Sequence, residues 1–146
     1  MANRVLKFLI FGLLSFAFAQ AQEAKPLARH PGDVIKYGLT FDGPNADRIK
    51  AVSGGLSLKG PIQKDQSGFT NGIGSRGTLT APKTFVLEFT VPPNIATGDY
   101  HLEGIGASAD EGSADYSDPQ DFKVPDIHIE NPKTFTPPGI TVKPLP

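Results

Sequence analysis

The 146-residue chain contains no cysteine and no tryptophan, and it has only three histidines. Without cysteine it forms no disulfides, and we expect no lipid-modified anchor behind a signal peptide. No asparagine stands in an Asn-x-Ser/Thr acceptor site for N-glycosylation. A domain of about 100 residues can fold on its core alone. These absences favour a bacterial periplasmic or surface protein that is stabilised by its hydrophobic core.

One long apolar run is present, and it lies near the N-terminus. Residues 8–19 carry no charge and follow Arg4 and Lys7, and two overlapping Ala-x-Ala cleavage sites come at the end of the run. This pattern is typical of a secretory signal peptide. The run is about a dozen residues long, whereas a membrane-spanning helix needs roughly 20. The sequence therefore predicts a cleaved signal, residues 1–21, and an exported chain with no membrane span after cleavage.

The charge of the remaining chain argues against one class of partner. Removal of the signal leaves 12 basic and 15 acidic residues, a net charge of −3. No basic stripe is available to neutralise phosphates, so we expect no nucleic-acid partner.

The pattern of the mature chain is that of an all-β protein. Residues 22–32 form a polar arm interrupted by proline, and residues 33–130 contain alternating apolar runs separated by turn residues, without helical periodicity. Gly54-Gly55 interrupts one run and marks a candidate bulge. Candidate strands cover residues 35–41, 48–58, 68–73, 77–80, 85–91, 100–107 and 127–130.

Two neighbouring stretches carry a family resemblance. Leu87-Glu88-Phe89-Thr90-Val91-Pro92-Pro93, followed by Ala96-Thr97-Gly98-Asp99-Tyr100-His101-Leu102, resembles strand E, the E–F turn and strand F of immunoglobulin-like and fibronectin type III-like domains. The resemblance implies an antiparallel β-sandwich of about seven strands over residues 33–130. It also implies a hydrogen bond from the Tyr100 hydroxyl to the backbone at the corner. It implies no particular function, because such sandwiches have many roles.

An acidic segment is the main candidate for metal binding. Five carboxylates fall within the twelve residues 110–121. This segment is predicted to contain a loop, and its small residues allow tight turns. Calcium prefers several oxygen ligands on a flexible loop, so the set is a candidate calcium site, against the alternative of a solvated acidic loop. The candidate ligands are Asp110, Glu111, Asp115, Asp118 and Asp121.

Signs of catalysis are few. His101 shares a strand face with Glu103, and His128 shares one with Glu130, so a surface metal patch is conceivable if the two strands are neighbours. No nucleophile elbow, His-Glu-x-x-His pair or phosphate-binding glycine loop is present. The sequence predicts a protein that is not an enzyme and has no cofactor apart from the calcium candidate.

The last segment, residues 131–146, is rich in proline, which favours an extended, poorly packed tail. Ile140 and Val142 alternate with Thr141 and Lys143, so the tail could instead add as an edge strand to its own sheet or to another subunit. The overall prediction is an exported binding or structural module of the cell envelope, with a protein or a surface polymer as its partner. The alternatives are a calcium-binding module, and an inhibitor or chaperone-like protein that captures exported partners by an edge strand or the tail.

Overall fold

The computed structural model describes residues 27–117 and 122–145. The predicted signal peptide, the first part of the arm, Asp118 and Asp121 lie outside these residues. The described chain is all-β, as the sequence predicts, and none of its helical segments is long and apolar enough to span a membrane.

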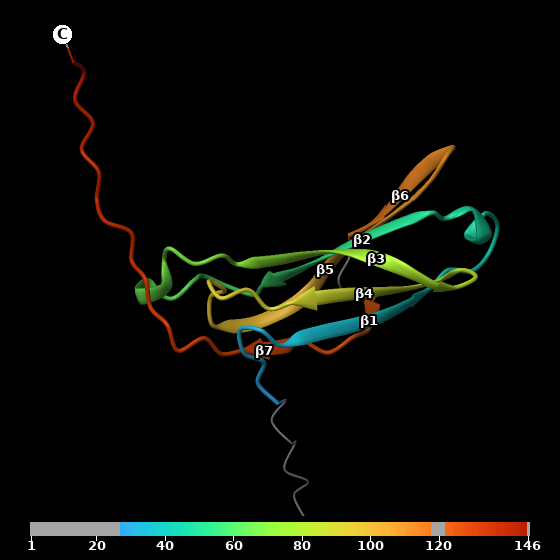
Figure 1. The fold of residues 1–146 in the computed structure, drawn as a ribbon, viewed down its shortest axis with the longest axis horizontal. Helices are drawn as coiled ribbons and strands as arrows, with labels where there is room; N and C mark the ends of the chain where they lie inside the picture. Colours follow the sequence, from blue (N-terminus) through green and yellow to red (C-terminus); the bar gives the residue numbers. More distant parts are fainter. Residues whose placement is uncertain (1–26, 118–121, 146) are drawn as a thin grey trace, which may run out of the picture.

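Seven strands form one curled antiparallel sheet (Figure 1). The order across the sheet is β1-β4-β3-β2-β5-β6, and β7 pairs with the first residues of β5. Two 3-10 turns, η1 and η2, flank β2. The elements are β1 (Val34–Thr40), η1 (Ala46–Arg48), β2 (Ala51–Leu58), η2 (Lys64–Gln66), β3 (Gly72–Ala81), β4 (Thr84–Thr90), β5 (Gly98–Ala109), β6 (Gly112–Tyr116) and β7 (Ile127–Ile129).

The sheet curls because β3 changes partner along its length. Its first half pairs with β2, with Ile73 opposite Leu56, whereas its second half pairs with β4, with Leu79 opposite Phe85. At the other side, Arg29 makes a parallel bridge to Ile129, which joins the N-terminal arm to β7. The curled sheet therefore encloses one core.

Alternation in β1, β4 and β5 places apolar residues inside, since successive side chains of a strand point to opposite faces. Tyr100, Phe85 and Phe89 are the largest fully buried side chains. The core cluster consists of Ile35, Val52, Leu56, Ile73, Phe85, Leu87, Phe89, Val91, Ile95, Tyr100, Leu102, Ile105, Ala107 and Ile129.

A bulge lies beside the predicted Gly54-Gly55 position, but it is in the partner strand: β2 steps from Gly55 to Leu56 while β5 skips Glu103. Gly54 also meets the core closely. A Cβ atom at this position would lie 2.6 Å from Cδ1 of Leu87. The absence of a side chain at Gly54 lets β2 lie close to Leu87 of β4.

Three predicted boundaries are wrong. The run predicted as a strand from residue 48 begins instead at Ala51, after the η1 turn, and the two short strands predicted within residues 68–80 are one strand, β3. The acidic segment predicted as a loop over residues 110–118 contains a strand, β6, which pairs with β5 as a hairpin. Backbone pairing with β5 explains β6, because all five of its residues are exposed and its own pattern has no buried face.

Candidate functional site: the root of the C-terminal segment

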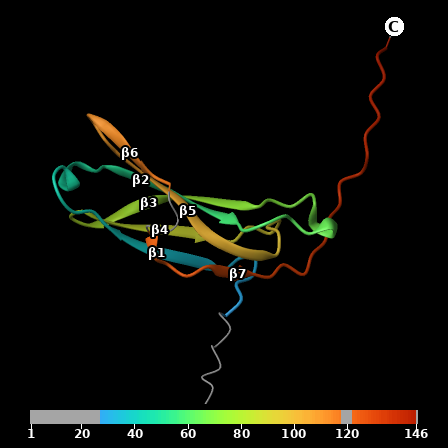
Figure 2. The same cartoon turned by 180° about the vertical axis from the view of Figure 1, so that it is seen from behind.

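The β5–β6 hairpin and the C-terminal segment leave the molecule at opposite ends of its long axis, in both views (Figures 1 and 2). We call residues 131–136 the root and residues 137–145 the exposed segment. Both were predicted as one poorly packed tail, but they differ in their contacts. The root carries the most extensive buried polar network of the described chain.

Gln66, at the end of η2, is the centre of this network. Its side chain is 2 % exposed. Its Oε1 accepts a hydrogen bond from the Thr97 amide at 2.8 Å, and its Nε2 donates to the carbonyl oxygens of Asn131 at 2.9 Å and Lys133 at 2.8 Å. One buried amide therefore ties η2, the turn before β5 and the root together.

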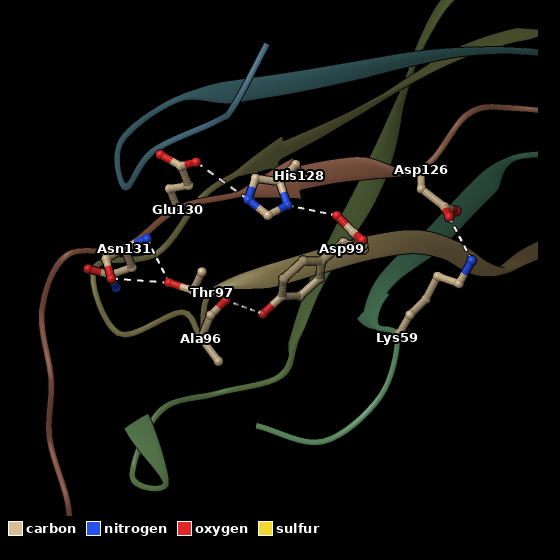
Figure 3. Close-up of polar contacts among 9 residues, drawn as sticks. Lys59, Ala96, Thr97, Asp99, Asp126, His128, Glu130 and Asn131 are labelled. Carbon is tan, nitrogen blue, oxygen red and sulfur yellow. Dashed lines mark hydrogen bonds and ion pairs between the residues drawn. The ribbon is translucent and has the colours of Figure 1, made fainter. Parts of the chain in front are cut away.

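Asn131 makes the complementary contacts from the root, and it is 5 % exposed. Its Nδ2 donates to the carbonyls of Pro93 and Ile95, and its Oδ1 accepts from the Lys133 amide. The Asn131 amide donates to Oγ1 of Thr97, a contact drawn in Figure 3. All these groups need partners because a buried polar group without one is costly.

Tyr100 supports the same corner from inside the core. Its hydroxyl donates to the Ala96 carbonyl at 2.8 Å, so the backbone bond that the resemblance predicts is confirmed (Figure 3). Burial raises the pKa of the Tyr100 phenol to about 12. The phenol therefore stays neutral and keeps its donor proton over the physiological pH range.

The root is also held by backbone bonds to the η2 region. The Phe135 amide donates to the Asp65 carbonyl at 2.8 Å, and the Gly68 amide donates to the Phe135 carbonyl at 3.1 Å. The Phe135 ring lies directly on Gly68, where a Cβ atom would be 2.3 Å from Cδ1 of the ring. A glycine is therefore required at position 68 if Phe135 is to keep this position.

Beyond the root, the chain makes few contacts. Ile140, Val142 and Leu145 are 88 %, 81 % and 90 % exposed. Exposed aliphatic side chains in one short segment are unusual when they serve no contact. The root thus fixes the direction of a segment that presents apolar side chains to the surroundings.

Two of the three calcium candidates in the β5–β6 hairpin are already engaged in ion pairs. Asp110 pairs with Lys50, and Glu111 pairs with Arg48, which ties the tip of the hairpin to the segment between β1 and β2.

The third candidate, Asp115, lies on β6 opposite Gly106 of β5. Asp118 and Asp121 fall outside the described residues. Within residues 27–117 and 122–145, no group of three or more histidine and carboxylate side chains is arranged to hold a metal ion. Calcium binding by the full acidic set stays a prediction.

The two strands that carry His101 and His128 are neighbours, as the proposed surface metal patch required. The register, however, places His128 opposite Asp99. The Nδ1 atom of His128 lies 2.7 Å from Oδ1 of Asp99, and its Nε2 lies 3.5 Å from Oε1 of Glu130 (Figure 3). His128 therefore links β7 to Asp99 of β5 and to Glu130, the residue before the root.

A second ion pair on this face joins β2 to the segment before β7. Nζ of Lys59 lies 2.7 Å from Oδ2 of Asp126 (Figure 3), and the hydrogen bond and charge of Asp126 raise the pKa of Lys59. The pair is exposed, so its effect on stability is small.

Sequence reasoning identified Tyr100 but missed Gln66 and Asn131. The signal that could have found Asn131 is weak: a single amide two residues after the alternating Ile127–Ile129 run and directly before Pro132. Gln66 lies in a polar segment and has no sequence signal at all. No protein-family model matches this chain, and no curated protein is similar to it.

Proposed function

We propose that the chain is an exported, non-catalytic binding module with an immunoglobulin-like β-sandwich, and that it binds a protein partner through the exposed segment. Export is supported by the signal-peptide pattern of residues 1–21. The β-sandwich is supported by which strands pair with one another. β1, β4 and the second half of β3 pair as strands B, E and D do in such sandwiches, while β2, β5 and β7 pair as strands C, F and G do.

One observation carries the binding role: a fixed root next to an exposed apolar segment. Within the described residues, the two buried polar side chains, Gln66 and Asn131, both hold the root. A tail without a function needs no such network, because ordering each residue of backbone costs about 1–2 kcal/mol. The network therefore indicates that the position and direction of the segment matter.

The composition of the exposed segment fits peptide recognition. Pro137, Pro138 and Pro144 restrict the backbone to extended conformations, so little conformational entropy is lost when a partner binds. Ile140 and Val142 project from the same side of an extended chain, since they are two residues apart. A groove or a sheet edge with two apolar pockets would match this segment.

The test compares capture by the mature chain with capture by a version truncated after Pro138. This truncation keeps the whole root, whereas a cut after Glu130 would remove Asn131 and damage the fold. Each protein is immobilised and exposed to an envelope extract of the cells that make it. We expect a specific protein to be captured by the full chain and lost with the truncation.

A matched pair of full-length variants tests whether capture needs an apolar side chain of the exposed segment or only the presence of the segment. We expect Val142→Asp to lose the captured protein and Thr141→Ala to retain it, because Val142 is one of the two apolar contact side chains and Thr141 projects from the other side. Capture of the same protein in equal amounts by the full and truncated chains would contradict the proposed function.

A further inference from the structure

The hairpin end of the molecule has an open sheet edge. β6 pairs with β5 along one edge only, and its other edge has no strand partner among the described residues. An unpaired edge offers backbone donors and acceptors to an added strand. Five paired positions along β5 hold β6, and the exposed ion pairs Lys50–Asp110 and Arg48–Glu111 add a small contribution at the hairpin tip.

A cavity of about 340 Å³ lies between one face of the β5–β6 hairpin and the segment that joins β1 to β2. Its apolar wall includes Phe41, Ile49 and Ala107, and β6 contributes Ala114 and Tyr116. The rings of Phe41 and Tyr116 lie 6.5 Å apart between centroids. A strand added to β6 would therefore find a place for apolar side chains on one of its faces.

The two faces of β6 differ in character. Ala114 and Tyr116 face the cavity, whereas Asp115 points to the opposite face because side chains alternate along a strand. Asp115 forms no ion pair with any described residue. An added strand that matched β6 would thus carry apolar residues on one face and a cation on the other.

The exposed segment of this same chain has that pattern. Ile140 and Val142 alternate with Thr141 and Lys143, and residues 137–145 contain no acidic residue. With the two aliphatic side chains over the cavity, Lys143 falls on the face of Asp115. One register therefore places the apolar side chains of the segment over the cavity and its cation on the same face as Asp115.

We propose that residues 139–143 of one copy add to the free edge of β6 of a second copy. The exposed segment leaves at the end opposite β6, so it points away from the hairpin of its own molecule (Figures 1 and 2). Contact between two different surfaces of identical copies is heterologous, and it repeats from copy to copy. This inference rests on the proposed function, for which it names the partner as the chain itself.

The test is sedimentation velocity of the purified mature chain, residues 22–146, over a range of concentrations at low salt. We expect dimers and larger species to grow with concentration, and the version truncated after Pro138 to stay monomeric. Lys143→Glu and Asp115→Lys each place like charges together, so each should weaken association by about fivefold. Combining the two substitutions in one chain should restore it.

Circular dichroism and thermal unfolding of each variant provide the folding control, since Asp115 and Lys143 are both exposed. A mature chain that is monomeric at every concentration overturns the inference. So does a double variant that associates no better than the single ones, or a truncated chain that associates like the full one. If the chain is monomeric but still captures a different protein through the exposed segment, the inference fails while the proposed function stands.

Discussion

Replacing Gln66 by alanine should loosen the root and lower the stability of the whole module. The substitution leaves the Thr97 amide and the Lys133 carbonyl without a partner and removes one of the two donors to the Asn131 carbonyl. The Asn131 carbonyl keeps the Thr97 hydroxyl as a donor at 3.1 Å, whereas the partly buried Thr97 amide and Lys133 carbonyl each lose their bond at a cost of about 1–3 kcal/mol. We therefore expect the free energy of unfolding to fall by about 2–4 kcal/mol.

Gln63 provides the matched control. It is an exposed glutamine three residues earlier, at the start of η2, and its side chain caps nothing. Urea unfolding of Gln66→Ala and Gln63→Ala measures both effects, and the midpoint should shift without a change in slope. If Gln66→Ala stays within about 0.5 kcal/mol of Gln63→Ala, an effect typical of surface substitutions, the root network does not stabilise the fold and the reasoning fails.

Two further predictions concern the core. Tyr100→Phe leaves the Ala96 carbonyl unpaired and should cost about 1–3 kcal/mol, while the exposed Tyr116→Phe should cost little. The pKa of tyrosine is near 10 in the unfolded chain and about 12 for folded Tyr100, so this contribution to wild-type stability should be complete below pH 10 and fall by about 1.4 kcal/mol per unit between pH 10 and about 12. Tyr100→Phe should lack this part of the fall in urea titrations at alkaline pH, and an unchanged slope would contradict the assignment. Gly54→Ala brings a Cβ to 2.6 Å from Leu87 and should cost about 1–3 kcal/mol in thermal unfolding. Gly55→Ala meets nothing within 4 Å and should not destabilise, so equal losses would refute the packing argument.

The strands that the sequence predicts well are those with one buried face. β4 alternates Phe85, Leu87 and Phe89 inward, and the period of two survives because this strand lies in the middle of the core. β3 has no such pattern over Gly72–Ala81, because it leaves one neighbour for another halfway along. Its pairing is decided by the strands beside it.

The root could not be predicted from the sequence either, and the reason differs from that for β3. Gln66 and Asn131 are polar residues in segments that look solvated, and their partners are mostly backbone groups. The contact between the two residues spans 65 positions. Backbone carbonyls carry no sequence signature, so only the folded chain brings these groups together.

The central claim is that residues 137–145 are a contact segment, and photo-crosslinking from within the segment tests it most directly. A photoreactive residue replaces Ile140 in the full chain, in the cells that make it, and a second chain carries the same residue at Leu79, which is also exposed but lies on β3. The account predicts a discrete adduct from position 140 and none from position 79. No adduct from position 140, or equal adducts from both positions, would contradict it.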